Sequence, residues 1–107
     1  MFEVDLYCTP DGSVPVIEWL RGLGNAKTAT RIADRLERIA SGVMGDVKAV
    51  GDGVWELRFH FGPGYRVYYS RVGSTVVVLL CGGNKSTQRR DTVTAKRYLV
   101  EYKGRTK

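Results

Sequence analysis

The stretch that decides the fold is WELRFHFGPGYRVYY, residues 55–69. In its first half, apolar residues alternate with charged ones, which indicates a half-buried strand with a period of two. Gly62-Pro63-Gly64 interrupts this pattern, because glycine tolerates positive φ and proline cannot donate a ladder hydrogen bond. The alternation resumes at Tyr65. The stretch therefore predicts an antiparallel β-hairpin with one apolar face and one basic face.

A strand pairing that is symmetric about Pro63 gives this hairpin a self-consistent register. A slip of one residue would set apolar side chains against polar ones. We expect the basic face to be exposed, with two guanidiniums, an imidazole and a phenol that suit a phosphodiester. The apolar pairs would be Phe61–Tyr65, Phe59–Val67 and Leu57–Tyr69, and the polar pairs His60–Arg66 and Arg58–Tyr68.

The residues before the hairpin predict one strand and two helices. Alternation over residues 2–8 indicates the strand. Ser13, as an N-cap ahead of Pro15, begins a short helix. Apolar residues at spacings of three and four indicate a second helix over residues 26–40. These two helices are expected to form a helical hairpin that packs on a sheet.

The segments around the hairpin complete an α+β fold. Residues 47–50 are compatible with a short strand, and the apolar run 75–81 indicates a central strand buried on both faces. A final helix is expected from about residue 86 to 102. The order predicts an N-terminal strand and a helical hairpin packed mainly on one face of a four-stranded, mainly antiparallel sheet, with a C-terminal helix.

Length and composition indicate one domain over residues 1–107, with 104–107 as a frayed tail. No apolar run approaches the roughly 20 residues of a membrane span, and residues 2–8 are too short and too acidic for a signal peptide. We therefore expect a cytoplasmic protein. Reduced thiols at Cys8 and Cys81 are favoured, and a disulfide between them is the alternative. Neither cysteine has the spacing of a zinc site, and no metal is expected.

The charge is divided unevenly along the chain, whose net charge is +6. Residues 1–57 contain six basic and nine acidic residues, a net charge of −3, whereas residues 58–107 contain eleven basic and two acidic residues, a net charge of +9. A strongly basic surface attracts nucleic acid through counterion release, although it also serves solubility.

Several motifs, taken together, resemble the RelE/ParE toxin superfamily, in particular its HigB-like "addiction module killer protein" branch. The resemblance runs nearly end to end. Its motifs are Trp19-Leu20, residues 31–36, Gly45-Asp46-Val47-Lys48, Glu56-Leu57-Arg58, residues 62–69, and Gly82-Gly83-Asn84-Lys85-Ser86-Thr87-Gln88.

This resemblance implies the toxin of a type II toxin–antitoxin system, a metal-independent and cofactor-free endoribonuclease that cleaves translated mRNA on the ribosome. It also implies a cognate antitoxin, most often a helix-turn-helix protein, through which the complex binds operator DNA. Two alternatives stay open, namely a ParE-like gyrase inhibitor without nuclease activity and a non-catalytic RNA-binding module.

By position, the resemblance places basic catalytic residues at Arg58, Arg66 and Lys85. Arginines would stabilise the phosphorane that forms when the 2′-hydroxyl attacks, and Lys85 would either bind phosphate or supply a proton. His60 is a candidate base or acid because of its ordinary pKa range. Glu56 is a weaker candidate that would otherwise hold Arg58 in place, so the proton-transfer residue is left open.

Further residues are candidates for RNA binding. Lys48 matches a basic loop residue of the resembled family. Tyr68 would either stack on a base or form ordinary sheet surface. Arg89 and Arg90 would either face ribosomal RNA or lie on a solvated helix face.

Overall fold

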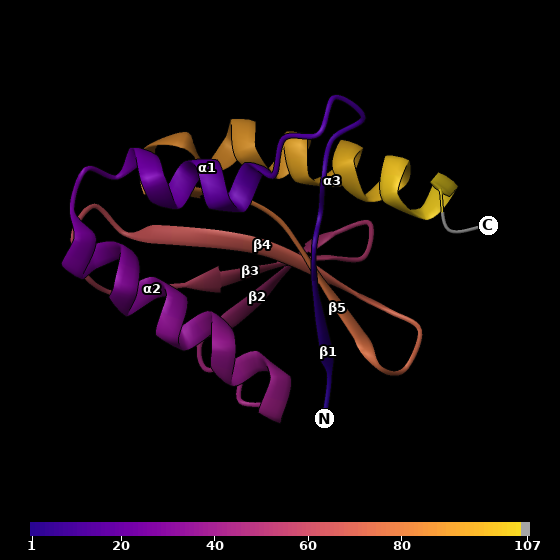
Figure 1. The fold of residues 1–107 in the computed structure, drawn as a ribbon, viewed down its shortest axis with the longest axis horizontal. Coiled ribbons are helices and arrows are strands. Elements are labelled where there is room, and N and C mark those ends of the chain that lie inside the picture. Colours follow the sequence, from indigo (N-terminus) through magenta and orange to yellow (C-terminus); the bar gives the residue numbers. More distant parts are fainter. Residues whose placement is uncertain (106–107) are drawn as a thin grey trace.

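The computed structural model describes residues 1–105, which form a twisted sheet of five strands and three α-helices (Figure 1). Along the chain the elements are β1 (Glu3–Leu6), α1 (Pro15–Gly22), α2 (Ala26–Arg38), β2 (Val47–Gly51), β3 (Val54–Arg58), β4 (Tyr65–Val72), β5 (Val76–Asn84) and α3 (Gln88–Arg105), with short 3₁₀ helices at Ile39–Ser41 and Lys85–Thr87.

The sheet is mixed, with strand order β1-β5-β4-β3-β2. Strands β2 to β5 form an antiparallel meander, whereas β1 lies parallel to β5, with Glu3 opposite Val76. The prediction of a four-stranded sheet is therefore wrong, because β1 joins it as a fifth, parallel strand, although the α+β class is confirmed. A parallel pair requires a long crossover connection, and the α1–α2 hairpin lies within that connection.

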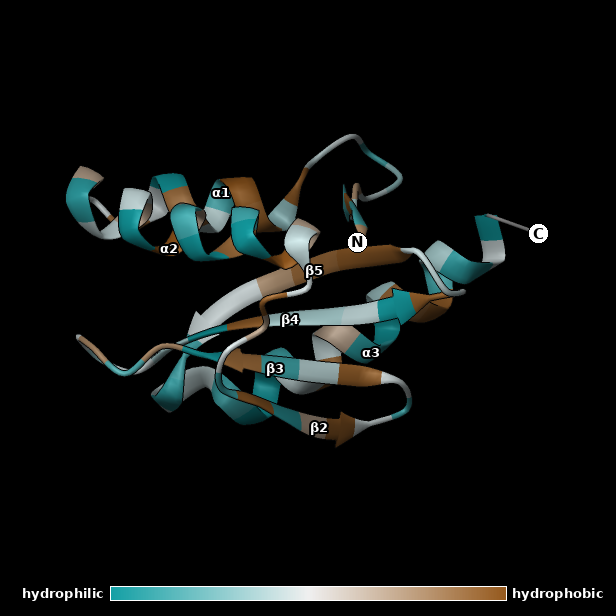
Figure 2. Ribbon diagram, turned by 90° about the horizontal axis from the view of Figure 1, so that it is seen from below, coloured by the Kyte–Doolittle hydropathy of each residue, from teal (hydrophilic) through white to brown (hydrophobic). Residues whose placement is uncertain are grey.

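The helices cover both faces of the sheet, and not mainly one face as predicted. Figure 2 shows α1 and α2 on one side and α3 on the other. Both β4 and β5 contain a run of consecutive buried residues, and successive side chains of a strand point to opposite faces, so each face of the sheet requires a cover. The expectation that residues 75–81 form a strand buried on both faces is confirmed for residues 77–81.

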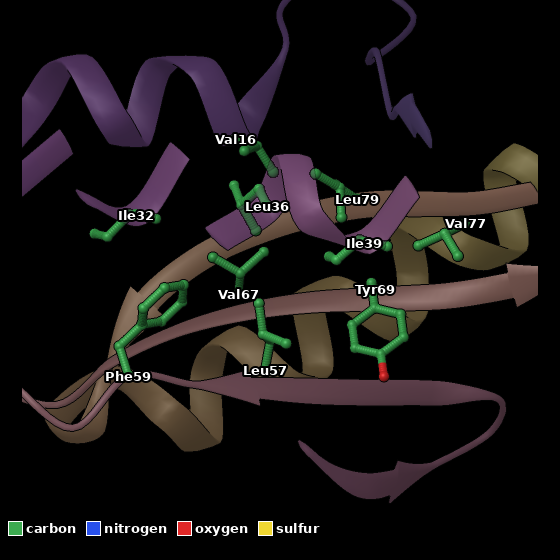
Figure 3. Close-up of a cluster of buried hydrophobic side chains, with 10 residues drawn as sticks. All are labelled: Val16, Ile32, Leu36, Ile39, Leu57, Phe59, Val67, Tyr69, Val77 and Leu79. Atoms are coloured by element: carbon green, nitrogen blue, oxygen red, sulfur yellow. The ribbon is translucent and has the colours of Figure 1, made fainter. Parts of the chain in front are cut away.

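The core is accordingly split into two clusters of buried side chains. Figure 3 shows the first, which lies between α2 and the sheet. It contains Val16, Ile32, Leu36, Ile39, Leu57, Phe59, Val67, Tyr69, Val77 and Leu79. The second lies under α3 and contains Tyr7, Val54, Tyr68, Val78, Leu80, Cys81, Ala95 and Leu99.

The β3–β4 hairpin has the predicted faces but a different register. Arg58 lies opposite Arg66, and Leu57 opposite Val67, so the pairing is displaced by two residues from the one predicted. Residues 59–64 form a loop that is longer than Gly62-Pro63-Gly64, and a hydrogen bond from the Phe59 amide to the Tyr65 carbonyl (3.0 Å) joins its ends. Because the displacement is even, each strand residue keeps its predicted face.

The chain ends of the described region differ in part from the expectation. Gly104 and Arg105, predicted to be frayed, belong to α3, while residues 106–107 of the predicted tail lie outside the described residues.

Cys8 and Cys81 are both free thiols, as favoured. No helix within residues 1–105 has the length and apolar character needed to cross a membrane.

We predict that Gly82→Ala destabilises the protein by about 1–3 kcal/mol, because a β-carbon at Gly82 would overlap the indole ring of Trp19 in α1. Urea unfolding followed by circular dichroism measures this change. Gly22→Ala is the matched control, since a β-carbon there meets open space within a helix and should be neutral or slightly stabilising. Equal stabilities of the two variants would contradict the packing of α1 on β5.

We also predict that only one thiol reacts readily with DTNB in the native protein at pH 8. Burial, with a smaller effect of Asp91, raises the pKa of Cys81 to about 12, while Cys8 is only half-buried. The raised pKa also means that burial of the neutral Cys81 thiol stabilises the folded protein. This contribution to stability is complete below the ordinary thiol pKa of 9.0 and is lost as the pH rises towards 12, because the native pKa is the higher one. Two equally fast thiols in native protein would disagree with the packing of Cys81.

Candidate active site

A buried carboxylate, that of Glu56 on β3, lies at the centre of the candidate site. Glu56 is 0% exposed and faces α3. Its Oε1 contacts Nε of Arg58 at 3.1 Å and Nε of Arg66 at 3.5 Å. Its Oε2 accepts hydrogen bonds from the Tyr68 hydroxyl (3.1 Å) and from Nε2 of Gln88 (2.8 Å). Two cations and two neutral donors thus compensate one buried charge, as burial of a carboxylate requires.

The two arginines lie opposite each other across β3 and β4. The Arg58 side chain is 28% exposed, whereas the Arg66 side chain is 9% exposed. Nη1 of Arg66 also donates to the carbonyls of Gly64 and Tyr65, each at 3.1 Å. With Glu56, the pair has a net charge of +1, and Arg58 is the member with more access to solvent.

Lys85 joins this cluster from the end of β5. A β-carbon at Gly64 would lie 3.3 Å from Cβ of Lys85 and 3.5 Å from Nη1 of Arg66, so the hairpin loop approaches both residues. Gly64 also has φ +76°, which favours glycine. Lys85 itself is exposed. The structure therefore gathers three of the four predicted catalytic residues at one end of the sheet.

Tyr68 does not lie on an exposed face, and the expectation of a fully exposed basic face is wrong. Tyr68 is 0% exposed, because α3 packs over the middle of that face. Its burial raises the pKa of its phenol, and the charge of Glu56 adds to this effect. A phenol in this position cannot stack on a base while α3 is in place.

His60 is also separated from the arginines. It lies in the loop after β3, and not opposite Arg66, and its side chain is 71% exposed. Its Nε2 contacts a carboxylate oxygen of Asp46, and this hydrogen bond is the main reason why the pKa of Asp46 is lowered. His60 is thus a surface side chain paired with Asp46.

The remaining RNA-binding candidates lie around the arginine cluster. Lys48 on β2 is exposed and pairs in register with Glu56, so both are on the same face of the sheet. Arg89 and Arg90 are exposed in the first turn of α3. Residues 1–105 contain no group of three or more His, Cys, Asp or Glu side chains that could hold a metal.

Two contacts of Glu56, those with Arg58 and with Gln88, differ in how far the sequence predicts them. The expectation that Glu56 holds Arg58 in place is confirmed by their 3.1 Å contact. The role of Gln88 was missed, because nothing in the local sequence distinguishes its amide from any other polar group at a helix start. What results is an electropositive end of the sheet, with Arg58 and Lys85 accessible, that suits a phosphate.

We predict that Glu56→Gln destabilises the protein by about 3 kcal/mol, because it leaves the guanidiniums of Arg58 and Arg66 without their counter-charge. Urea unfolding at neutral pH measures this loss. The control is Glu18→Gln on the exposed surface of α1, which should change stability by less than about 0.5 kcal/mol. A Glu56→Gln protein as stable as the control would refute the central role of this carboxylate.

Comparison with known proteins gives the family of the chain. Residues 18–101, which include every member of the arginine cluster, match the model of the family described as phage-derived protein Gp49-like (DUF891). The chain is also 46% identical over 78 residues to an uncharacterized protein of Haemophilus influenzae, a match that covers 73% of this chain and 79% of that protein. The chain therefore belongs to the Gp49-like family, which is associated with the toxins of toxin–antitoxin systems.

Proposed function

We propose that this protein is the toxin of a type II toxin–antitoxin system and acts as a ribosome-dependent endoribonuclease on translated mRNA. The family supports the toxin role. The single observation that carries the nuclease is the pairing of Arg58 and Arg66 around Glu56, with Lys85 beside them. In this proposal the protein is a HigB-like member of the RelE/ParE superfamily.

The proposed reaction uses the 2′-hydroxyl of the RNA as nucleophile. Its oxygen bonds to phosphorus and releases its proton to water, and the bond from phosphorus to the 5′-oxygen breaks. A 2′,3′-cyclic phosphate and a 5′-hydroxyl result. The phosphorane carries an extra negative charge that fixed cations stabilise more than they stabilise the starting diester.

Arg58 and Lys85 are the groups we propose to contact the phosphate, because both have access to solvent. Glu56 fixes the Arg58 side chain in advance, so less freedom is lost when the phosphate binds. Arg66 is mostly buried and contributes chiefly through its charge and by positioning Glu56.

Lys85 is also the proposed proton donor to the leaving 5′-oxygen. A lysine ammonium can give up a proton, whereas an arginine guanidinium stays protonated. His60 is left out of this step because its exposed ring pairs with Asp46, away from the arginine cluster.

The proposed partners follow from the toxin role. The family implies a cognate antitoxin. We propose a helix-turn-helix antitoxin through which the complex binds operator DNA, and the ribosome as the place where mRNA meets the toxin. The excess of positive charge over residues 58–107 supports contact with ribosomal RNA.

We predict that Lys85→Ala and Arg58→Ala each reduce mRNA cleavage by about 100-fold or more, as loss of one transition-state donor does. The measurement is induction in a bacterial host with primer extension on one transcript, with and without a functional start codon. Arg71→Ala is the matched control, because it removes one exposed cation at the opposite end of β4 from Arg66.

Cuts that require translation, and that vanish in both site variants but not in the control, are the expected result. Growth arrest with intact mRNA and with DNA damage would overturn the nuclease in favour of a gyrase inhibitor. RNA binding without cleavage, on and off the ribosome, would leave only a binding module.

A further inference from the structure

A cleft lies on the opposite face of the sheet from Glu56, between α2 and the loop after β3. Its volume is about 330 Å³, at the lower end of the range for small-ligand sites. Arg31, Asp34 and Arg38 line it from α2, and His60 and Phe61 line it from the loop. None of the α2 residues belongs to the cluster described above.

One neighbouring cation, Arg35, already has a structural role. Its Nη2 donates to the carbonyls of Met44 (3.2 Å) and Asp46 (3.1 Å), and its Nη1 donates to the carbonyl of Arg58. Its guanidinium lies over the buried ring of Phe59, 4.6 Å from the ring centroid. Arg35 therefore fixes the back wall of the cleft and ties the loop to α2.

The charged side chains of Arg31, Asp34 and Arg38 do not have a comparable structural role in the described residues. The guanidinium carbon of Arg31 lies over the ring of Phe61, 3.8 Å from its centroid, so that the two groups make a cation–π contact. Phe61 is itself held by edge contacts with Phe59 and Tyr65, at centroid distances of 6.0 and 5.6 Å. Across residues 1–105, the side chains of Arg31, Asp34 and Arg38 make no hydrogen bond or ion pair with the protein.

We propose that this cleft binds one guanine nucleotide of a single-stranded RNA. The base stacks on the outer face of the Arg31 guanidinium, as unpaired bases do on arginine planes. The Asp34 carboxylate accepts from the two adjacent N–H donors on the Watson–Crick edge of guanine, and Arg38 binds a phosphate. This inference rests on the proposed RNA substrate and extends it to a base preference.

The charge pattern favours RNA over an acidic peptide. A carboxylate between two arginines would repel the carboxylates of an acidic segment, whereas a nucleotide brings N–H donors and an anionic phosphate together. The Arg31 guanidinium, which lies over the Phe61 ring, is a planar group on which a planar base can stack.

The cleft also lies where a bound strand would meet the candidate active site. Arg58 ends β3 with its side chain in the Glu56 cluster, and Phe59 follows it with its side chain on the α2 face. His60 and Phe61 continue directly into the cleft. One strand of RNA that crosses the β3–β4 loop would contact both sites.

The test is fluorescence anisotropy with fluorescein-labelled, 2′-O-methyl octamers, which lack the attacking hydroxyl. One probe is oligouridine with a single guanine, and two others carry inosine or adenine at that position. We expect wild type to bind the guanine probe most tightly. Arg31→Lys, which keeps the charge but loses the plane, should weaken binding of the guanine probe about 5-fold or more.

Asp34→Asn should abolish the preference for guanine without changing the salt dependence. Arg38→Ala should weaken binding to all probes and reduce the slope of log affinity against log salt by about 0.7, the value for one phosphate on a single strand. Arg71→Ala, a surface cation on the far part of β4, should preserve the preference for guanine.

Equal affinity of wild type for the three probes, or Asp34→Asn and Arg31→Lys proteins that bind like wild type, would overturn the proposal. So would cleft variants that keep RNA affinity but lose affinity for a polyglutamate peptide. The assay needs neither ribosome nor cleavage, so a failed nuclease experiment and a failed cleft are distinguished.

Discussion

The need to neutralise one buried carboxylate links much of this structure. Glu56 takes its compensating groups from three separate elements, with Arg58 on β3, Arg66 on β4 and Gln88 at the start of α3. These contacts fix the side chains of Arg58 and Arg66 beside the carboxylate, and Arg66 is also held by the carbonyls of Gly64 and Tyr65. The docking of α3 and the placement of the proposed phosphate-binding cations are therefore one arrangement.

The sheet separates two basic regions that meet at a single loop. On one face, the arginines are fixed by Glu56 and the cluster opens at Lys85. On the other face, Arg31 lies over Phe61 and makes no hydrogen bond or ion pair within the described residues 1–105. The first region presents cations that are fixed in advance, as the proposed phosphate chemistry requires. The second presents a planar guanidinium and exposed hydrogen-bonding groups, as the proposed recognition of a base requires.

Much of the fold was predictable from the sequence, because alternation decides which residues share a face. The hairpin faces, the second helix and the doubly buried strand depend on local patterns. Three features depend on tertiary structure and were missed. The first is the six-residue hairpin loop, which places Arg58 opposite Arg66. The second is the cover that α3 forms over Tyr68, although few residues of α3 are buried. The third is the contact of Arg31 with Phe61, thirty positions further along the chain. Local periodicity contains no information on such contacts.

The parallel pairing of β1 with β5 has a consequence for the order of folding. Residues 3–6 have their strand partners at residues 76–79, so the sheet cannot be completed on the ribosome until most of the chain has been synthesised. The Glu56 cluster is completed later still, when Gln88 arrives with α3. A nascent chain therefore lacks the complete Glu56 cluster until α3 has been synthesised.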